Sequence, residues 1–171
     1  MKKFEQKLIG YIPNLRRYAA ALTANSQTYA DDLVQDTLER ALKKHSFWMR
    51  GSNLRAWLFT IMHNVFINQL NHKTLKYVDN EILNNVSSLE EPSQDYYIQQ
   101  LKQHMESLPA SQKEVILLVS VEGFSYEEVS GILDIPMGTV MSRLHRSRDK
   151  MRLRLSTEKL NNNTSYLRRI K

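Results

Sequence analysis

The chain has 171 residues, 42% of them hydrophobic, with a formal net charge of +6 and no cysteine. This length suits one domain or two small ones, and the lack of cysteine excludes disulfides and thiolate metal sites. The sequence has neither an apolar run of about 18 residues nor the core of a signal peptide, so we expect a cytoplasmic protein without a membrane span.

The charge is distributed unevenly along the chain. Residues 1–75 carry eleven Lys and Arg against five Asp and Glu, whereas residues 76–100 carry one against five. Residues 101–155 are nearly balanced at eight against seven, and residues 156–171 carry four against one. Basic segments on both sides of an acidic one indicate a polyanionic partner, although charge alone is equally consistent with a solubilising surface.

Three helices are predicted in the first 75 residues. Apolar side chains recur every three or four residues over 4–24, which predicts an amphipathic helix. Residues 31–45 form the second helix, with acids in its first turn and bases in its last, as the helix dipole favours. After a loop over 47–53, residues 54–73 form the third helix, with Trp57 on its apolar face.

The composition then changes to a polar, acidic stretch over residues 76–97, which we expect to be a flexible linker. A second helical block follows, with helices over 95–108, 109–123 and 125–134 and a last helix that begins at Pro136 and runs to about residue 155. Ser125 and Glu128 predict a capping box at the start of the third of these helices. We therefore expect an all-α protein with two small helical domains, residues 1–75 and 98–156, joined by the acidic linker and followed by a basic tail, residues 157–171, that frays.

The last two predicted helices form a helix-turn-helix, with Asp134, Ile135 and Pro136 as the turn. Aspartate tolerates a left-handed backbone, and proline is accepted at the start of a helix. In the last helix, spacings of three and four residues predict an inward face of Val140, Leu144, Ser147, Met151 and Leu155. A second face, near the N-terminal end that enters the major groove in such motifs, carries Met141, Ser142, His145 and Arg146.

Basic residues surround the rest of this helix: Arg143, Arg148, Lys150, Arg152 and Arg154. They suit contacts with phosphates, which position a protein on DNA without reading its sequence. The alternative is a solvated helix end, because bases near a helix C-terminus are favourable in any case.

Two motif sets resemble the sigma-70 family, in the family's order along the chain. The segment "LPASQKEVILLVSVEGFSYEEVSGILDIPMGTVMSRLHRSRDKMR" resembles sigma region 4, and "ADDLVQDTLERALKKHSFWMRGSNLRAWLFTIMHNVFINQL" resembles region 2. Over roughly residues 5–155 the chain is similar to the extracytoplasmic-function (ECF, group IV) class. The resemblance implies a sigma factor that binds core RNA polymerase and directs initiation at promoters with −10 and −35 elements.

The resemblance also implies roles for individual residues. The β′ clamp helices of core polymerase would be met by Asp32, Gln35, Asp36 and Glu39. The loop over residues 47–53 would receive a flipped −10 base, and the −10 contacts would come from Trp48, Arg50, Ser52, Asn53, Arg55, Asn64 and Asn68. Contacts with the −35 element would come from Thr139, Met141, Ser142, Arg143, His145, Arg146 and Arg148. Further implied partners are the β flap and an anti-sigma factor.

From the residues alone, these N-terminal sites remain open to other interpretations. The four core-binding candidates share a helix face by their spacing, which is also typical of a solvated surface. Phe47 and Trp48 could stack a base or could fill the gap between two helices. Asn64 and Asn68 share a face four residues apart, and asparagine is a poor helix former, so an exposed pair is as consistent with a polar role as with an ordinary solvated surface.

Other functional classes have less support in the sequence. The chain has no nucleotide-binding glycine loop, no metal-site spacing among its five histidines and no nucleophile with a recognisable base, so we expect no enzyme activity, metal or cofactor. One alternative is a free-standing helix-turn-helix regulator, against which the region 2 resemblance argues. Another is an anti-anti-sigma mimic that binds a protein instead of DNA, against which the basic last helix argues.

Overall fold

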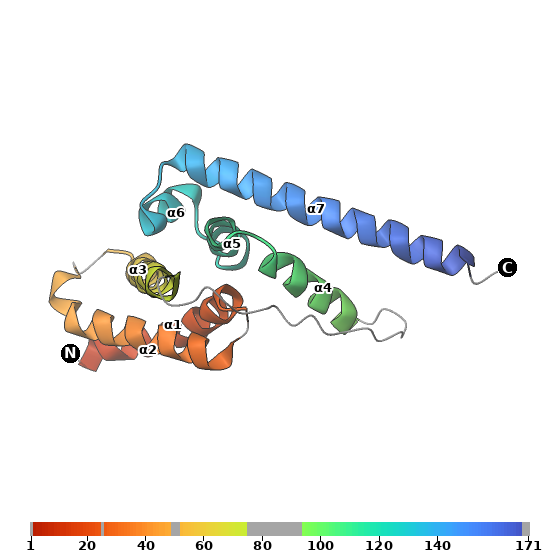
Figure 1. Cartoon of the computed structure of the whole chain (residues 1–171). Coiled ribbons are helices and arrows are strands. Elements are labelled where there is room, and N and C mark those ends of the chain that lie inside the picture. The colour runs from red at the N-terminus through yellow and green to blue at the C-terminus, as the bar shows by residue number, and fades with distance from the viewer. Residues whose placement is uncertain (1, 25, 49–51, 75–93, 169–171) are drawn as a thin grey trace.

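The computed structural model describes residues 2–24, 26–48, 52–74 and 94–168, and all their regular structure is helical (Figure 1). This confirms the all-α expectation. The elements are α1 (Lys2–Leu22), α2 (Gln27–Lys43), η1 (His45–Phe47), α3 (Leu54–Thr74), α4 (Gln94–Glu106), α5 (Ala110–Ile116), η2 (Leu117–Val121), α6 (Tyr126–Leu133) and α7 (Met137–Arg168). Most of the predicted linker, residues 76–93, lies outside the described residues, and residues 94–97 belong to α4.

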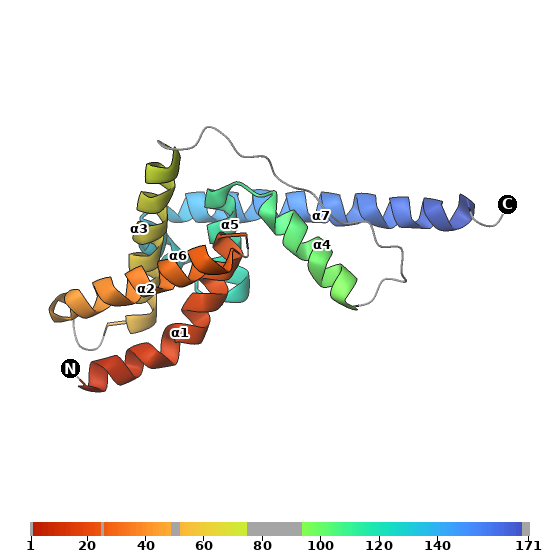
Figure 2. The same ribbon diagram turned by 60° about the horizontal axis from the view of Figure 1, so that its bottom comes forward.

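The N-terminal half comprises α1 to α3. In it α2 packs against both α1 and α3 (Figure 2). α2 begins at Gln27, four residues earlier than predicted, so the expected acids in its first turn are not there. Ser26, with an extended backbone, is the N-cap, and Gln27 Nε2 donates to Asp31 Oδ2 at 2.8 Å across the added turn. The side-chain pair therefore stabilises a helix start that the charge pattern did not indicate.

The C-terminal half, which comprises α4 to α7, contains a break that the periodicity did not predict. The expected helix over 109–123 is α-helical only to Ile116 and continues as the π-helical turn η2. The amide of Glu122 donates to the carbonyl of Leu117 at 2.9 Å, a spacing of five residues instead of four. One extra residue in a turn rotates the positions that follow, so Glu122 takes a different direction from the one a continuous α-helix gives it.

The helix-turn-helix agrees with the local sequence signals. Ser125 Oγ accepts from the Glu128 amide, and Glu128 Oε2 accepts from the Ser125 amide, which completes the predicted capping box. Asp134 has a left-handed backbone with φ 51°. The carbonyl of Pro136 accepts from the Thr139 and Val140 amides, and α7 begins at Met137.

The tail prediction was wrong, because α7 continues through residue 168 instead of ending near 156. An existing helix grows by one hydrogen bond per added residue without a new nucleation step, so a polar sequence can extend a well-packed helix. Val140, Leu144, Ser147 and Met151 are buried as expected, whereas Leu155 is 36% exposed. The C-terminal end of α7 extends past the other helices, as both views show (Figures 1 and 2).

The two halves share one hydrophobic core. α3 packs against α6 and α1 against α5. Phe59 lies at the centre, with its ring centroid 5.1 Å from that of Tyr18 in α1 and 5.1 Å from that of Phe124 in the C-terminal half. This docking of one half on the other was not predicted from the sequence.

Candidate nucleic-acid interface

α7 presents its predicted base-reading face to solvent near its N-terminal end. Met141, Ser142, His145 and Arg146 are exposed, while Val140, Leu144 and Ser147 point into the helix-turn-helix core. Ser147 Oγ donates to the Arg143 carbonyl of its own helix at 2.7 Å and also lies 3.2 Å from the Gln112 carbonyl of α5. Of the other −35 candidates, Arg148 is exposed, and Thr139 and Arg143 are half-buried.

Two members of this face already have partners on the same helix. Ser142 Oγ donates to the Thr139 carbonyl at 3.1 Å. His145 Nε2 lies 3.1 Å from Asp149 Oδ2, one turn further along α7. Arg146 has the longest side chain on the face, and it stands among exposed neighbours.

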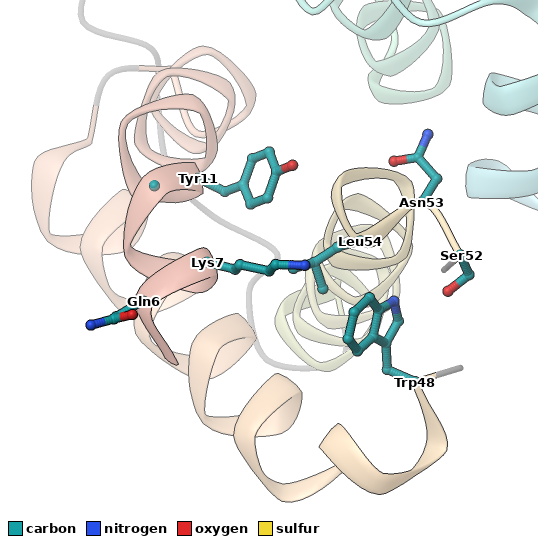
Figure 3. Close-up of a pocket in the computed structure, with 8 residues that line it drawn as sticks. Gln6, Lys7, Tyr11, Trp48, Ser52, Asn53 and Leu54 are labelled. Carbon is teal, nitrogen blue, oxygen red and sulfur yellow. The ribbon is translucent and has the colours of Figure 1, made fainter. Parts of the chain in front are cut away.

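A pocket of about 600 Å³ lies between α1 and the residues Trp48 and Ser52 to Leu54. It is lined by Gln6, Lys7, Gly10, Tyr11, Trp48, Ser52, Asn53 and Leu54 (Figure 3). The Lys7 ammonium lies 5.7 Å from the centre of the Trp48 ring, which rests against Phe4 at 5.5 Å. Trp48 therefore both packs against α1 and forms a wall of the pocket, so the two interpretations of this residue are compatible. The side chain of Phe47 lies outside the described residues.

The pocket combines an aromatic wall with polar groups and a cation, a set that suits a nucleobase and its phosphate. Trp48, Ser52 and Asn53 were predicted for this function from the resemblance, whereas Lys7 and Tyr11 on the α1 side of the pocket were not. Spacing along the chain gave no signal for them, because about forty residues separate α1 from the loop. Arg50 lies outside the described residues.

The structure divides the remaining −10 candidates between two faces of α3. At about 100° per residue, Arg55 and Asn64 lie about 180° apart around the helix. Asn64 and Asn68 are exposed. Asn53 and Arg55 instead contact the C-terminal half: Asn53 Nδ2 donates to Glu128 Oε1 at 2.7 Å, and Arg55 Nη2 donates to Glu122 Oε2 at 3.0 Å.

On α2, three of the four core-binding candidates, Asp32, Gln35 and Glu39, are exposed. Gln35 Nε2 donates to Glu39 Oε1 at 3.3 Å along the helix. Asp36 is half-buried and accepts from Gln69 Nε2 of α3 at 2.9 Å, so it also joins two helices. This face of α2 is thus accessible, but Asp36 is already held by Gln69 of α3.

A buried polar cluster between the halves was not found from the sequence. Both carboxylate oxygens of Glu122 accept hydrogen bonds from the N-terminal half, and the donors are Asn14, Arg17 and Arg55. Nearby, His63 Nδ1 lies 2.7 Å from Glu114 Oε1. Burial, together with the negative charges of Glu114 and Glu122, raises the pKa of the Tyr18 hydroxyl well above its usual value, so the phenol stays neutral.

Two family models match the chain. The sigma2 domain of PhyR matches residues 8–63, and sigma-70 region 4 matches residues 98–151. The ECF RNA polymerase sigma factor EcfG of Rhodopseudomonas palustris is 35% identical over 146 residues, which cover 84% of this chain and 80% of that protein.

The chain belongs to the ECF sigma factor family. Members direct RNA polymerase to promoters, and this sigma factor is accordingly a transcription initiation factor with the region 2 and region 4 domains of the family. The match to both regions disfavours a free-standing helix-turn-helix regulator.

Solved structures support the same assignment. The sigma factor RpoE of Bartonella quintana, solved with the anti-sigma factor NepR, superposes with a TM-score of 0.77 at 35% identity, covering 91% of this sigma factor and 98% of that chain. The anti-anti-sigma factor PhyR, also from Bartonella quintana and solved with NepR, has a TM-score of 0.58 at 19% identity, covering 86% of this chain and 49% of that one. The PhyR likeness shows the fold alone.

Within the described residues, none of the helices has the length and apolar character needed to cross a membrane. In the same part of the chain, no group of three or more His, Asp or Glu side chains could hold a metal ion.

Proposed function

We propose that this sigma factor works in the cytoplasm as a dissociable subunit of RNA polymerase, acting by binding and not by catalysis. The exposed face of α2, with Asp32, Gln35, Asp36 and Glu39, binds the β′ clamp helices, and the region 4 half binds the β flap. The observation that carries the proposal is α7, whose N-terminal face is exposed and carries Arg146, with Arg143 and Arg148 beside it, while its opposite face is packed into a helix-turn-helix core.

Promoter DNA is read at two places. On α7, Met141, Ser142, His145 and Arg146 meet −35 base edges, while Thr139, Arg143 and Arg148 contact the backbone. In the N-terminal half, the pocket between α1 and the 47–53 loop takes an unstacked −10 base, with Trp48 as the stacking surface and Lys7 near the phosphate. Asn64 and Asn68 contact the same strand from the exposed face of α3, and Arg50, Ser52, Asn53 and Arg55 complete the −10 set.

Reconstitution with core RNA polymerase tests this function. The purified chain is mixed with core polymerase and a randomised promoter library, and the transcripts are sequenced. We expect enriched −10 and −35 elements with core, and no sequence-specific gel shift from the chain alone. Gln35→Ala, which removes an exposed side chain of α2, should weaken co-purification with core without changing thermal stability. A specific shift without core would instead indicate a free-standing regulator.

We further propose that an anti-sigma factor inhibits this chain, because the RpoE relative was solved with NepR. The family match to the PhyR sigma2 domain favours a second candidate function, in which the chain binds an anti-sigma factor and thereby releases another sigma factor. The exposed arginines of α7, Arg146, Arg148 and Arg152, support promoter binding, the first function. Release of a second sigma factor from its inhibitor, with no transcript from this chain and core, would favour the second.

A further inference from the structure

Met137 and Met141 lie one turn apart at the start of α7, where this helix packs beside α6 (Figure 1). Their exposed fractions are 48% and 45%, and within the described residues neither belongs to the hydrophobic core. The core instead takes Val140 and Leu144 from this part of the helix. Packing of the helix-turn-helix therefore does not account for a long apolar side chain at either methionine position.

The two methionines differ in their direction around α7. Val140 and Leu144, both buried, mark the side of the helix that faces the core. At about 100° per residue, Met137 lies about 40° from the middle of that side and Met141 about 80° from it. By the same geometry, Arg146 lies about 140° beyond Met141 around the exposed face. Met141 and Arg146 therefore stand at the two edges of the exposed face, whereas Met137 lies closer to the core.

Between these two edges lie two polar side chains that already have partners on α7. The Ser142 hydroxyl donates to the Thr139 carbonyl at 3.1 Å, and His145 Nε2 lies 3.1 Å from Asp149 Oδ2. Part of their hydrogen-bonding capacity is thus used within the helix. Discrimination between bases then depends more strongly on the side chains at the edges of the face, one apolar and one cationic.

The chemistry of a thioether restricts what Met141 can recognise. Its sulfur offers the major groove no donor and only a weak acceptor. Placed against a polar base edge, it would displace water without replacing the hydrogen bond that the base loses, which weakens binding. The apolar group that the major groove presents is the C5-methyl of thymine. Contact with this methyl removes apolar surface from water on both sides, and the unbranched methionine side chain adapts to it.

We propose that Met141 is a specificity-determining residue that selects thymine at one position of the −35 element through contact with the C5-methyl group. The inference rests on the proposed function, because it requires α7 to lie in the major groove. Met141 then reads a methyl at one edge of the face, while Arg146 at the other edge reads the acceptors of a guanine. Loss of one methyl from such an apolar contact lowers affinity about fourfold.

The test removes only the methyl group. The −35 element obtained from the promoter library is placed in a fluorescein-labelled duplex, and its thymines on both strands are replaced one at a time by deoxyuridine. Uracil keeps the hydrogen-bonding groups of thymine and lacks the C5-methyl. The holoenzyme of the full chain with core RNA polymerase is titrated with each duplex. We expect one position at which uracil weakens binding of the unaltered protein about fourfold.

Three variants assign this uracil penalty to a side chain. Met141→Gln keeps the length of the side chain but makes its end polar, so it should bind the thymine and uracil duplexes equally well. Met141→Leu remains apolar and should keep most of the penalty. Met137→Gln is the matched control, because Met137 has the same side chain on the same helix with nearly the same exposure, and it should keep the full penalty. Both positions are about half exposed, so the fold is retained, and melting curves check this.

The proposal would be overturned if every uracil penalty of the unaltered protein persisted in Met141→Gln. Loss of the penalty in Met137→Gln as well would also overturn it, because the effect would then come from the helix start as a whole. In both cases promoter-specific transcripts would still support the proposed function. Failure of the proposed function is a separate result, in which core polymerase with this chain selects no −35 element, and it would overturn this inference too.

Discussion

Lys113 shows how a single charged residue can oppose folding. It lies in α5, is 7% exposed, and burial lowers the pKa of its amine, although the negative charge of Glu106 acts in the other direction. The aliphatic stem of lysine packs well among apolar neighbours, whereas its ammonium loses hydration there. The position therefore suits an apolar side chain of similar length.

We predict that Lys113→Met raises the thermal stability of the chain at pH 7. The Lys113 amine holds its proton less tightly in the folded state than in the unfolded state. The unaltered protein therefore gains stability as the pH rises from the pKa of Lys113 in the folded state to its unfolded pKa of about 10.4. The advantage of Met should therefore shrink over that window. Melting curves of both proteins between pH 7 and pH 10 measure this difference in thermal stability. A difference that grows with pH would contradict the conclusion that burial destabilises the charged form of Lys113.

At the scale of the element, α7 carries two exposed arginines at different levels along one helix. Arg146 lies on the exposed face near the N-terminal end, and Arg152 lies beyond the helix-turn-helix core, also exposed. The first position suits a base edge in the major groove, and the second suits a phosphate.

We predict that Arg146→Ala weakens the free energy of promoter binding by about 1–3 kcal/mol. The variant should also discriminate less between bases at one position of the −35 element. Arg152→Ala should weaken all promoters alike and reduce the slope of log K against log salt by about one. Holoenzyme binding to a −35 library at several salt concentrations separates the two effects. Equal behaviour of the two variants would show that they do not have distinct roles.

The elements themselves show what sequence can predict. The capping box of Ser125 and Glu128, and the left-handed Asp134, depend on neighbours within a few residues, so both were predictable. The Glu122 cluster was not, because its partners lie 67 to 108 residues away along the chain. The η2 turn was missed for a similar reason, since its residues fit helical periodicity and tertiary packing decides between α and π.

At the scale of the whole molecule, one core joins two halves that match separate family models. Phe124 is 4% exposed and contacts Phe59 across the boundary. Apolar surface shared in this way couples the unfolding of one half to that of the other.

We predict a single calorimetric transition for the full chain, with calorimetric and van't Hoff enthalpies in agreement. Phe124→Ala should cost about 3–5 kcal/mol and lower the Tm by about 10 °C. Leu33→Ala, a buried change within the N-terminal half, is the control for loss of core volume alone. Two well-separated transitions in the unaltered chain would show that the halves fold independently.

The η2 turn also changes the direction in which the side chains that follow it leave the helix. With one more residue in the turn than an α-helix holds, the side chain of Glu122 is rotated by about 100° relative to α5. Deleting any one residue of Leu117–Val121 would restore regular α-helical phase and turn the carboxylate away from α1 and α3. The direction of this acid is therefore encoded in the number of residues before it, and no single side chain in the turn specifies it.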